Sequence, residues 1–193
     1  MLPAGEALQR LKDGNARYVQ GESIHPCTEA SARESLVDGQ KPFAAILGCA
    51  DSRAVPELAF DTSIGELFVV RVAGNVANPE NNGSLEYAVA HLGVQLIVVL
   101  GHQNCGAVTA ALQGYDGPGQ IQSIVEAIAP AVDEAKDLDG DPLDNAIRSN
   151  ARRVARLLEQ QDPILSGAVE SGELTVVPAC YRLDSGQVEF LDP

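Results

Sequence analysis

The stretch LIVVLGHQNCGAVTAAL, residues 96–112, joins a short apolar run to a segment compatible with a helix. Every residue from Leu96 to Leu100 is apolar, so the run has no side that is suited to face water. Runs of this length that are apolar on both faces are typical of buried strands in parallel sheets. A buried strand followed directly by a helix indicates an α/β fold.

Two earlier segments show the same pattern. FAAILG, at 43–48, and LFVVRVAG, from Leu67, are apolar runs of strand length, and helix-compatible stretches lie between the runs. A fourth strand is expected in LTVVPACYRL, from Leu174, and the turn at 184–186 followed by VEFLD predicts a C-terminal strand or hairpin. We therefore expect a central, mostly parallel β-sheet of about four strands, flanked by helices and ending in that strand or hairpin.

Helical patterns occupy most of the remaining chain. The first helix is amphipathic, with Leu8, Leu11 and Tyr18 spaced among charged residues. A second helix is expected from about Thr28, which suits an N-cap, to Asp38. The other expected helices cover residues 54–59, 84–92, 105–112, about 121–136 and about 142–160.

The composition is that of a globular protein. With 193 residues, 45% of them hydrophobic and 21% charged, the chain can bury the core of one domain. We interpret residues 1–193 as a single domain with an N-terminal helical arm at about 1–38. The formal net charge of -14 argues against a nucleic-acid partner, because such binding relies on Lys and Arg side chains that neutralise phosphates.

The sequence shows no sign of a membrane segment. Its longest strongly apolar stretch, 96–100, is far shorter than the roughly 20 residues that cross a bilayer. The opening residues MLPAGEALQRLKDGNARYVQG lack the basic start and the apolar run of a signal peptide. We expect a cytoplasmic protein with no membrane partner, whose four cysteines are reduced and available for a metal or for catalysis.

Potential metal ligands follow two of the expected strands. Cys49 comes directly after FAAILG, His102 comes directly after LIVVLG, and Cys105 follows three residues later at the start of a helix. Because ligands in open α/β sheets bind beyond the carboxyl ends of the strands, we expect these side chains to share one crevice. Two thiolates and an imidazole suit tetrahedral zinc. The sequence thus predicts one Zn²⁺ per chain, bound by Cys49, His102 and Cys105.

The number of ligands favours a catalytic site. A catalytic zinc has three protein ligands and keeps a position for water or substrate, whereas a structural zinc has four protein ligands. No fourth ligand is obvious, because His25, Cys27 and His91 lie in other segments and are interpreted as surface or packing residues. Cys180, in an apolar strand, is interpreted as a small buried hydrophobic residue.

Asp51 and Arg53 follow Cys49 at intervals of two, in the expected turn between strand and helix. Taken alone, the pair would be interpreted as a helix cap with a local ion pair. Beside a metal, a carboxylate held by an arginine stays ionised and can accept the proton of a hydroxide on the metal, which orients the hydroxide. We therefore predict catalytic roles for Asp51 and Arg53.

Four motifs together resemble the β-class carbonic anhydrases: CADSR at 49–53, RVAGN at 71–75, SLEYAV at 84–89 and GHQNCGAV at 101–108. The segment ALQRLKDGNARYV is also similar to the first helix of that family, so the likeness spans nearly the whole chain. The resemblance implies a zinc enzyme that reversibly hydrates carbon dioxide to bicarbonate and a proton. It implies the three zinc ligands named above, with Asp51 and Arg53 as a gate and orienting dyad.

The resemblance also implies a substrate pocket. Gln40, Phe68 and Tyr87 occupy positions that line this pocket in plant-type members of the family, where it is built across a dimer interface. Gly106 is interpreted as a tight turn or as a wall against the substrate. We therefore expect a homodimer or homotetramer that acts on carbon dioxide and bicarbonate.

Some members of the family close the site by letting the aspartate take the fourth zinc position, under control of a second bicarbonate site that uses a Trp three residues before the first cysteine. This chain has Ile46 at that position and no Trp. Arg71 and Tyr181 match other parts of that second site. Without the Trp, the chain resembles the plant-type, open-site subgroup.

Two alternatives remain open. Close relatives of the family hydrolyse carbonyl sulfide or carbon disulfide, which are linear molecules open to the same attack, at the same kind of zinc site. A protein of this kind could also be non-catalytic, with a zinc that only holds the fold or with bicarbonate as a regulatory ligand.

Overall fold

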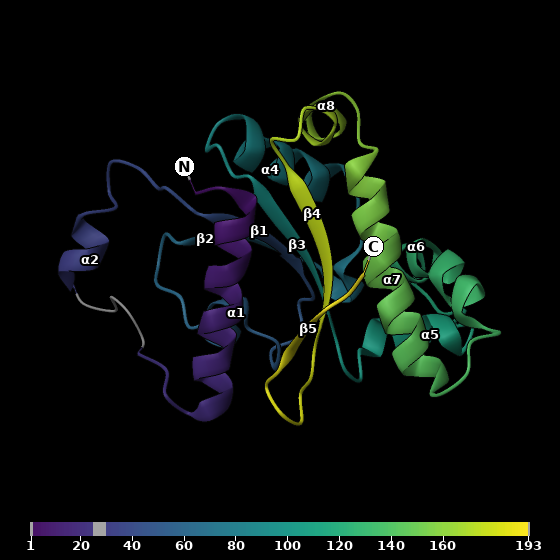
Figure 1. The fold of residues 1–193 in the computed structure, drawn as a ribbon. Coiled ribbons are helices and arrows are strands. Elements are labelled where there is room, and N and C mark those ends of the chain that lie inside the picture. The colour runs from purple at the N-terminus through teal and green to yellow at the C-terminus, as the bar shows by residue number, and fades with distance from the viewer. Residues whose placement is uncertain (1, 25–29, 193) are drawn as a thin grey trace.

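The computed structural model describes residues 2–24 and 30–192, which form a twisted five-stranded sheet with helices on both faces (Figure 1). The strand order is β2-β1-β3-β4-β5. The first four strands run parallel, and β5 pairs antiparallel with β4. The strands are β1 (Ala44–Gly48), β2 (Leu67–Arg71), β3 (Leu96–His102), β4 (Thr175–Tyr181) and β5 (Val188–Phe190). The predicted α/β fold is confirmed, and β4 and β5 form the expected C-terminal hairpin.

Eight α-helices connect and cover these strands in the described part of the chain. They are α1 (Ala4–Gln20), α2 (Ala30–Glu34), α3 (Pro56–Ala59), α4 (Pro79–Ala90), α5 (Gly106–Leu112), α6 (Ile121–Ala135), α7 (Pro142–Glu159) and α8 (Ile164–Glu170). A short 3₁₀ turn, η1 (Ala73–Asn75), follows β2. Helix α8 was not expected from the sequence.

Two predicted helix boundaries differ from the structure by four residues or more. The helix expected from residue 84 begins at Pro79, because the Asn78 side chain accepts a hydrogen bond from the Asn81 N–H and proline suits the first helical position. The helix expected as far as Asp38 ends at Glu34, and none of the residues of α2 is buried. The expected N-cap of that helix, Thr28, lies outside the described residues, as do His25 and Cys27.

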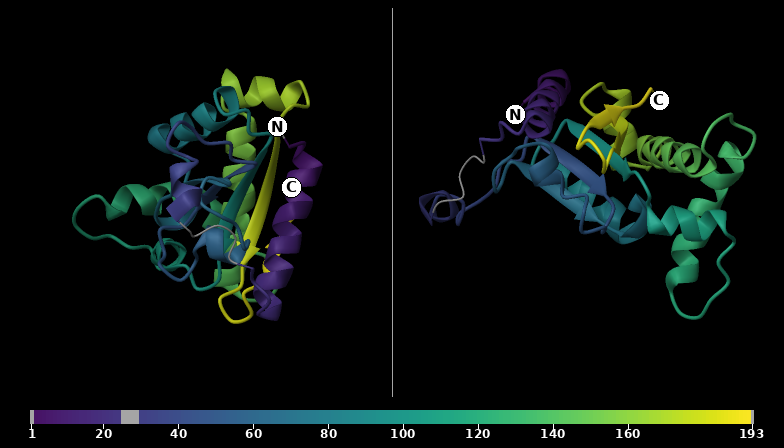
Figure 2. Two further views of the ribbon diagram at one scale, coloured as in Figure 1. Left: turned by 90° about the vertical axis from the view of Figure 1, so that its left-hand side faces the viewer. Right: turned by 90° about the horizontal axis from the view of Figure 1, so that it is seen from below.

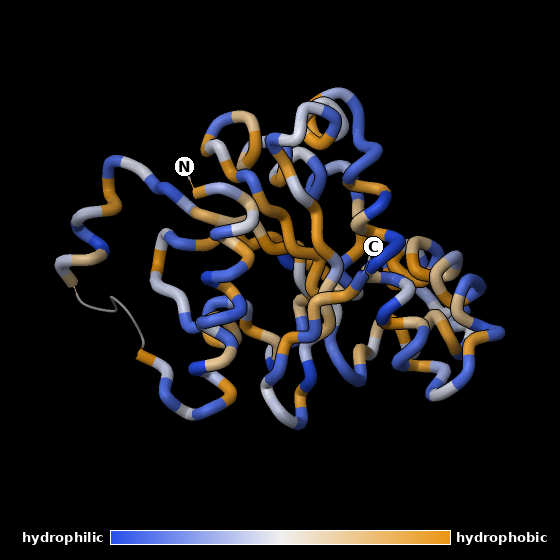
Figure 3. The backbone as a smooth tube through the Cα atoms, viewed as in Figure 1, coloured by the Kyte–Doolittle hydropathy of each residue, from blue (hydrophilic) through white to orange (hydrophobic). Residues whose placement is uncertain are grey.

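The sheet separates two hydrophobic clusters. Alternate residues of the central strands point to opposite faces, so Ala45 and Leu47 join one cluster and Ala44 and Ile46 the other. The first cluster packs under α4 to α8, and the second packs under α1 and α3 (Figure 2). The strongly hydrophobic residues are accordingly concentrated on the central strands of the sheet (Figure 3).

The N-terminal segments behave differently from each other. Helix α1 packs on the sheet with Ala7 and Leu11 fully buried. Helix α2 stands away from the sheet in two views (Figures 1 and 2). Near α2, the Leu36 side chain meets Gly65 of the loop before β2, which ties this part of the chain to the body of the protein.

Among the described residues, no helix combines the length and the apolar character that a bilayer span requires.

Helix α1 approaches the loop after α3 very closely at Gly14. A Cβ atom at this position would lie 1.9 Å from the Phe60 carbonyl oxygen. The next residue, Asn15, is buried and donates hydrogen bonds to the carbonyls of Ala59 (2.8 Å) and Gly186 (2.9 Å). Its own side-chain oxygen accepts one from the Val188 N–H (2.8 Å). These contacts fasten α1 to both α3 and the C-terminal hairpin.

The substitution Gly14→Ala is expected to lower the free energy of unfolding by at least about 2 kcal/mol, because the added methyl group would meet backbone that cannot move aside. Gly5→Ala, in the same helix, is the matched control, since a Cβ there has no atom within 4 Å. That variant should gain up to about 1 kcal/mol from the better helix propensity of alanine. Urea unfolding measures both. Equal gains in the two variants would contradict the close packing of α1.

Candidate active site

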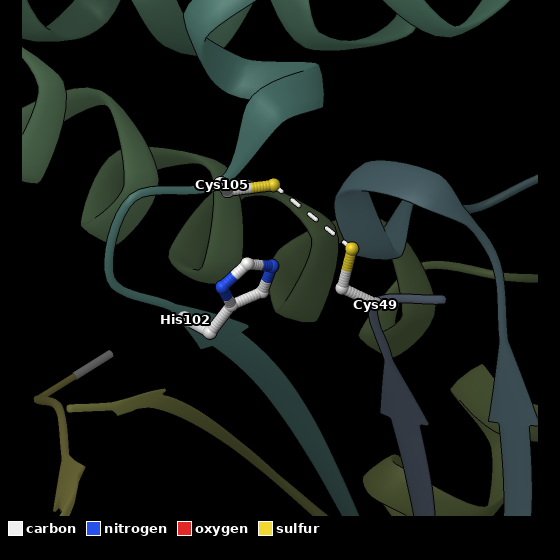
Figure 4. A group of neighbouring side chains, drawn as sticks. All are labelled: Cys49, His102 and Cys105. Carbon is white, nitrogen blue, oxygen red and sulfur yellow. Dashed lines mark hydrogen bonds between the residues drawn. The ribbon is translucent and has the colours of Figure 1, made fainter. Parts of the chain in front are cut away.

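The pairing of β1 with β3 brings the predicted metal ligands together. Gly48, at the end of β1, lies opposite Leu100 of β3, so the two strands leave the sheet side by side. Cys49 follows directly, His102 is the last residue of β3, and Cys105 is the N-cap of α5. We call Cys49, His102 and Cys105 the Cys–His–Cys group. Figure 4 shows the two thiols and one ring nitrogen of the imidazole turned toward one another.

The spacing within the Cys–His–Cys group suits a metal ion. The two sulfur atoms lie 4.0 Å apart, and the three potential ligand atoms all lie within 4.8 Å of one another. Zinc–sulfur bonds of about 2.3 Å in a tetrahedron would place two sulfur atoms about 3.8 Å apart. All three side chains are buried. The chain therefore offers the donor set and nearly the spacing that zinc requires.

The imidazole of His102 has one nitrogen with a hydrogen-bond partner and one nitrogen without. Its Nδ1 lies 2.9 Å from the Gln103 carbonyl oxygen. Its Nε2 is buried and has no hydrogen-bond partner among the described residues. Because a buried polar atom without a partner is costly, this nitrogen points to a ligand that the protein chain itself does not provide. A metal ion beside the two thiols would supply that partner.

Of the two thiols, Cys49 is prepared for the thiolate form that metals bind, whereas its hydrogen bond with Cys105, together with burial, raises the pKa of Cys105. The hydrogen bond with Cys105 lowers the pKa of Cys49 well below that of an ordinary thiol, against the opposing effect of burial. The Gly74 N–H also donates to the Cys49 sulfur, at 3.3 Å. A thiolate is therefore favoured at Cys49 near neutral pH.

Asp51 and Arg53 form a closely bonded pair beside the Cys–His–Cys group. The Asp51 carboxylate accepts hydrogen bonds from the Arg53 backbone N–H and Nε, both at 2.9 Å, and from a terminal guanidinium nitrogen at 2.8 Å. These bonds hold the pKa of Asp51 far below its usual range. One oxygen of Asp51 lies 3.8 Å from the unpartnered Nε2 of His102. The carboxylate is thus ionised, fixed in direction and close to the candidate metal position.

Arg71 supports the turn that carries these residues. Its guanidinium donates to the carbonyls of Cys49 (2.9 Å), Asp51 (2.5 Å) and Ala54 (3.1 Å). From the sequence, Arg71 was matched only to part of a second bicarbonate site. In the structure the guanidinium holds the backbone of the turn, and no pattern within the sequence could reveal which carbonyls it would meet.

Gly74 is required by its surroundings. Its φ of +72° is unfavourable for other residues, and a Cβ there would lie 2.6 Å from the Cδ1 atom of Ile128. Its carbonyl accepts a hydrogen bond from the buried Asn150 side chain of α7, at 2.8 Å. Sequence reasoning missed Asn150, since it lies 76 residues from Gly74 and belongs to no recognised motif.

The predicted pocket residues fall into two groups. Gly106 begins α5 beside Cys105, and a Cβ there would have no atom within 4 Å, so the space next to it is open. Phe68 and Tyr87 pack against each other with ring centroids 6.3 Å apart, and Tyr87 is 49% exposed. Gln40 lines a separate surface hollow of about 590 Å³.

His91 connects Tyr87, which packs on Phe68, with Gln40. Its ring lies 5.1 Å from that of Tyr87, and it lines the same hollow as Gln40. Among the described residues, no hydrogen bond or ring contact links Gln40, Phe68 or Tyr87 to the Cys–His–Cys group. Within one chain, Asp51, Arg53 and Gly106 lie beside the candidate metal position, whereas Phe68 packs against the larger hydrophobic cluster to which Cys49 and Cys105 also belong.

Known proteins show a clear relationship. The sequence profile of the family described as carbonic anhydrase matches residues 44–188. Carbonic anhydrase 2 of Mycobacterium tuberculosis is 40% identical over 190 residues, which cover 96% of this chain and 92% of the relative.

Solved structures agree with this relationship. The β-carbonic anhydrase CcaA superposes with a TM-score of 0.75 at 27% identity, over 96% of this chain and 99% of that one. A Coccomyxa β-carbonic anhydrase in complex with acetazolamide gives a TM-score of 0.76 at 28% identity, over 95% of this chain and 86% of that one. On its sequence and its fold alike, the chain belongs to the β-carbonic anhydrase family of enzymes.

Proposed function

We propose that this enzyme holds one Zn²⁺ per chain on the Cys–His–Cys group and hydrates carbon dioxide reversibly to bicarbonate and a proton. The observation that carries the proposal is the buried, unpartnered Nε2 of His102, which faces two thiols and lies 3.8 Å from an Arg-held carboxylate. Hydration of carbon dioxide is the general reaction of the family to which the chain belongs.

The geometry suggests separate roles for the metal, Asp51 and Arg53. The chemistry that zinc supplies in such a site is the deprotonation of water near neutral pH. Asp51 stays ionised because Arg53 holds it, so it can only accept a hydrogen bond from the attacking oxygen. That bond turns a lone pair of the attacking oxygen toward the carbon of the substrate. Arg53 acts by fixing Asp51.

The fourth metal position is proposed to hold water, as in open-site members of the family. Both oxygens of Asp51 are engaged by Arg53, which opposes their transfer to a metal. Arg71 supports the proposal of an open site as well. Its guanidinium already donates to three backbone carbonyls, and a second bicarbonate site would need the same guanidinium.

The substrate pocket is proposed to form between two copies of the chain. Gly106 leaves open space beside Cys105, whereas Gln40, Phe68 and Tyr87 lie together elsewhere on the same chain. In a homodimer or homotetramer these three would contact the carbon dioxide held at the other copy's metal. Aromatic side chains suit an apolar substrate, and the Gln40 amide could donate to the developing bicarbonate oxygen.

We further propose that the enzyme works in the cytoplasm. The three described cysteines, Cys49, Cys105 and Cys180, are free thiols, as expected in a reducing compartment. The net charge of -14 fits a small-molecule enzyme that has no nucleic-acid partner.

The metal assignment is tested by Cys49→Ser. This change should reduce zinc retained after dialysis from about one ion per chain to well under half, because an alcohol is a far weaker zinc ligand than a thiolate. Cys180→Ala is the control, since that thiol is buried in β4 and should not affect metal content. Elemental mass spectrometry gives the metal content. Full zinc occupancy in the Cys49 variant would contradict the assignment.

The orienting role is tested by Asp51→Asn. An amide can donate as well as accept, so it no longer imposes one direction on the attacking group, and kcat/KM for carbon dioxide should fall by about 100-fold or more. Zinc content should not change. Asp116→Asn, in the exposed loop after α5, should leave the rate as it was.

Stopped-flow hydration at mildly alkaline pH measures these rates. A wild-type rate of zero with full zinc would identify a non-catalytic protein. Hydrogen sulfide release from carbonyl sulfide that is faster per centre than carbon dioxide hydration would reassign the substrate.

The shared pocket is tested by mixing two variants. Asp51→Asn damages the metal side of the site, and Tyr87→Ala damages the proposed aromatic side. Each homo-oligomer should be weakly active. A co-expressed mixture should recover up to about a quarter of the wild-type rate per chain, since about half of the dimer pairs are mixed and half of the sites in a mixed pair regain both parts. No recovery, with mixed oligomers confirmed by native mass spectrometry, would place the whole pocket within one chain.

A further inference from the structure

The tautomer of His102 is set by the residue that follows it. A carbonyl oxygen can only accept, so the 2.9 Å contact between His102 Nδ1 and the Gln103 carbonyl requires the proton to lie on Nδ1. Nε2 then presents its lone pair toward the two thiols. A metal-binding histidine needs this arrangement, and partners of this kind orient the ring as well as fixing its tautomer. The position of the Gln103 carbonyl therefore matters to the metal site.

The Gln103 side chain is tied to a distant part of the chain. Its Oε1 accepts hydrogen bonds from the backbone N–H groups of Leu183 (2.9 Å) and Asp184 (3.3 Å). Its Nε2 donates to the Asp184 carboxylate at 3.0 Å. The Gln103 backbone N–H donates to the Tyr181 carbonyl at 2.9 Å. Four hydrogen bonds thus join this one residue to the end of β4 and to the turn between β4 and β5.

That turn is itself well anchored. Arg182 donates to the carboxylates of Asp144 in α7 (3.0 Å) and Asp184 (3.5 Å). On its other side, Asn15 of α1 bonds to Gly186 and Val188. The turn between β4 and β5 is therefore a fixed point from which Gln103 can be held.

The loop between β3 and α5, which contains Gln103, has an unusual backbone conformation. Asn104, which follows Gln103, has φ +54°, a left-handed conformation that few residues other than glycine and asparagine adopt readily. Side-chain hydrogen bonds from Gln103 help to keep the loop in this conformation and so help to fix the position of the Gln103 carbonyl.

We propose that Gln103 is a positioning residue. Asp184 holds the Gln103 side chain, and the Gln103 backbone carbonyl fixes the His102 ring so that Nε2 faces the metal. This inference rests on the proposed zinc site. It assigns to the turn between β4 and β5 a part in metal binding, through a side chain that touches neither metal nor substrate.

The first test is Gln103→Ala in the full chain. Loss of the tie should weaken zinc binding by about 10- to 100-fold, measured by competition with a chromophoric chelator. In the zinc-free protein, the ¹⁵N NMR signals of His102 should change from a single Nδ1–H tautomer to a mixture. Gln187→Ala is the control, because this exposed residue lies in the same turn and should leave both readouts unchanged.

A charge swap separates positioning from general stability. Gln103→Glu places a carboxylate against Asp184, so zinc binding should weaken as in the alanine variant. The double variant Q103E/D184N lets the new amide donate to the new carboxylate while the two backbone N–H groups keep their acceptor. Its zinc affinity should return to within about threefold of the wild type.

The outcomes are distinct. Unchanged zinc affinity and an unchanged tautomer in Gln103→Ala would overturn the inference, and so would a double variant no better than Q103E. If Gln103→Ala unfolds, recovery in the folded double variant still decides the question. A wild-type protein that binds no zinc would refute the proposed function, whereas the tautomer of the zinc-free protein would still test the inference.

Discussion

Parallel pairing of β1 with β3 sets Gly48 opposite Leu100, and the residues that follow both strands leave the sheet at the same edge. Two thiols and an imidazole are thereby buried within 4.8 Å of one another although Cys49 and His102 lie more than fifty residues apart in the sequence. This proximity depends on backbone hydrogen bonds and on the apolar clusters that cover both faces of the sheet.

Two members of the Cys–His–Cys group, Cys49 and His102, have support from different parts of the fold. The turn after Cys49 is held by Arg71, and the Cys49 sulfur by the backbone of Gly74, which Asn150 of α7 fixes in turn. His102 is held through Gln103 by the turn between β4 and β5. The group is therefore connected to several elements, so its geometry is built by the whole sheet and its helices rather than by one loop.

Local sequence patterns were sufficient for the sheet and for the residues at its carboxyl edge. Apolar runs identify strands because burial on both faces leaves no polar alternation, and Cys49 and His102 could be located from the strand ends alone. The supports could not be predicted in this way. Arg71 and Asn150 act on backbone atoms 17 to 76 residues away, and only the three-dimensional fold determines which carbonyl each one meets. The error at Pro79 is of a different kind, because Asn78 and Pro79 are local signals for a helix start that lie five residues before the expected one.

The alternation of β1 between the two hydrophobic clusters also limits how this chain can change over evolutionary time. Ala45, Leu47 and Cys49 face the cluster under α4 to α8, while Ala44 and Ile46 face α1 and α3. Substitution can alter these residues one at a time, but gain or loss of a single residue in β1 would turn the Cys49 thiol to the opposite side of the sheet. Residues in surface loops do not have to alternate between two buried faces. Insertions and deletions should therefore accumulate in the loops while the length of β1 stays constant.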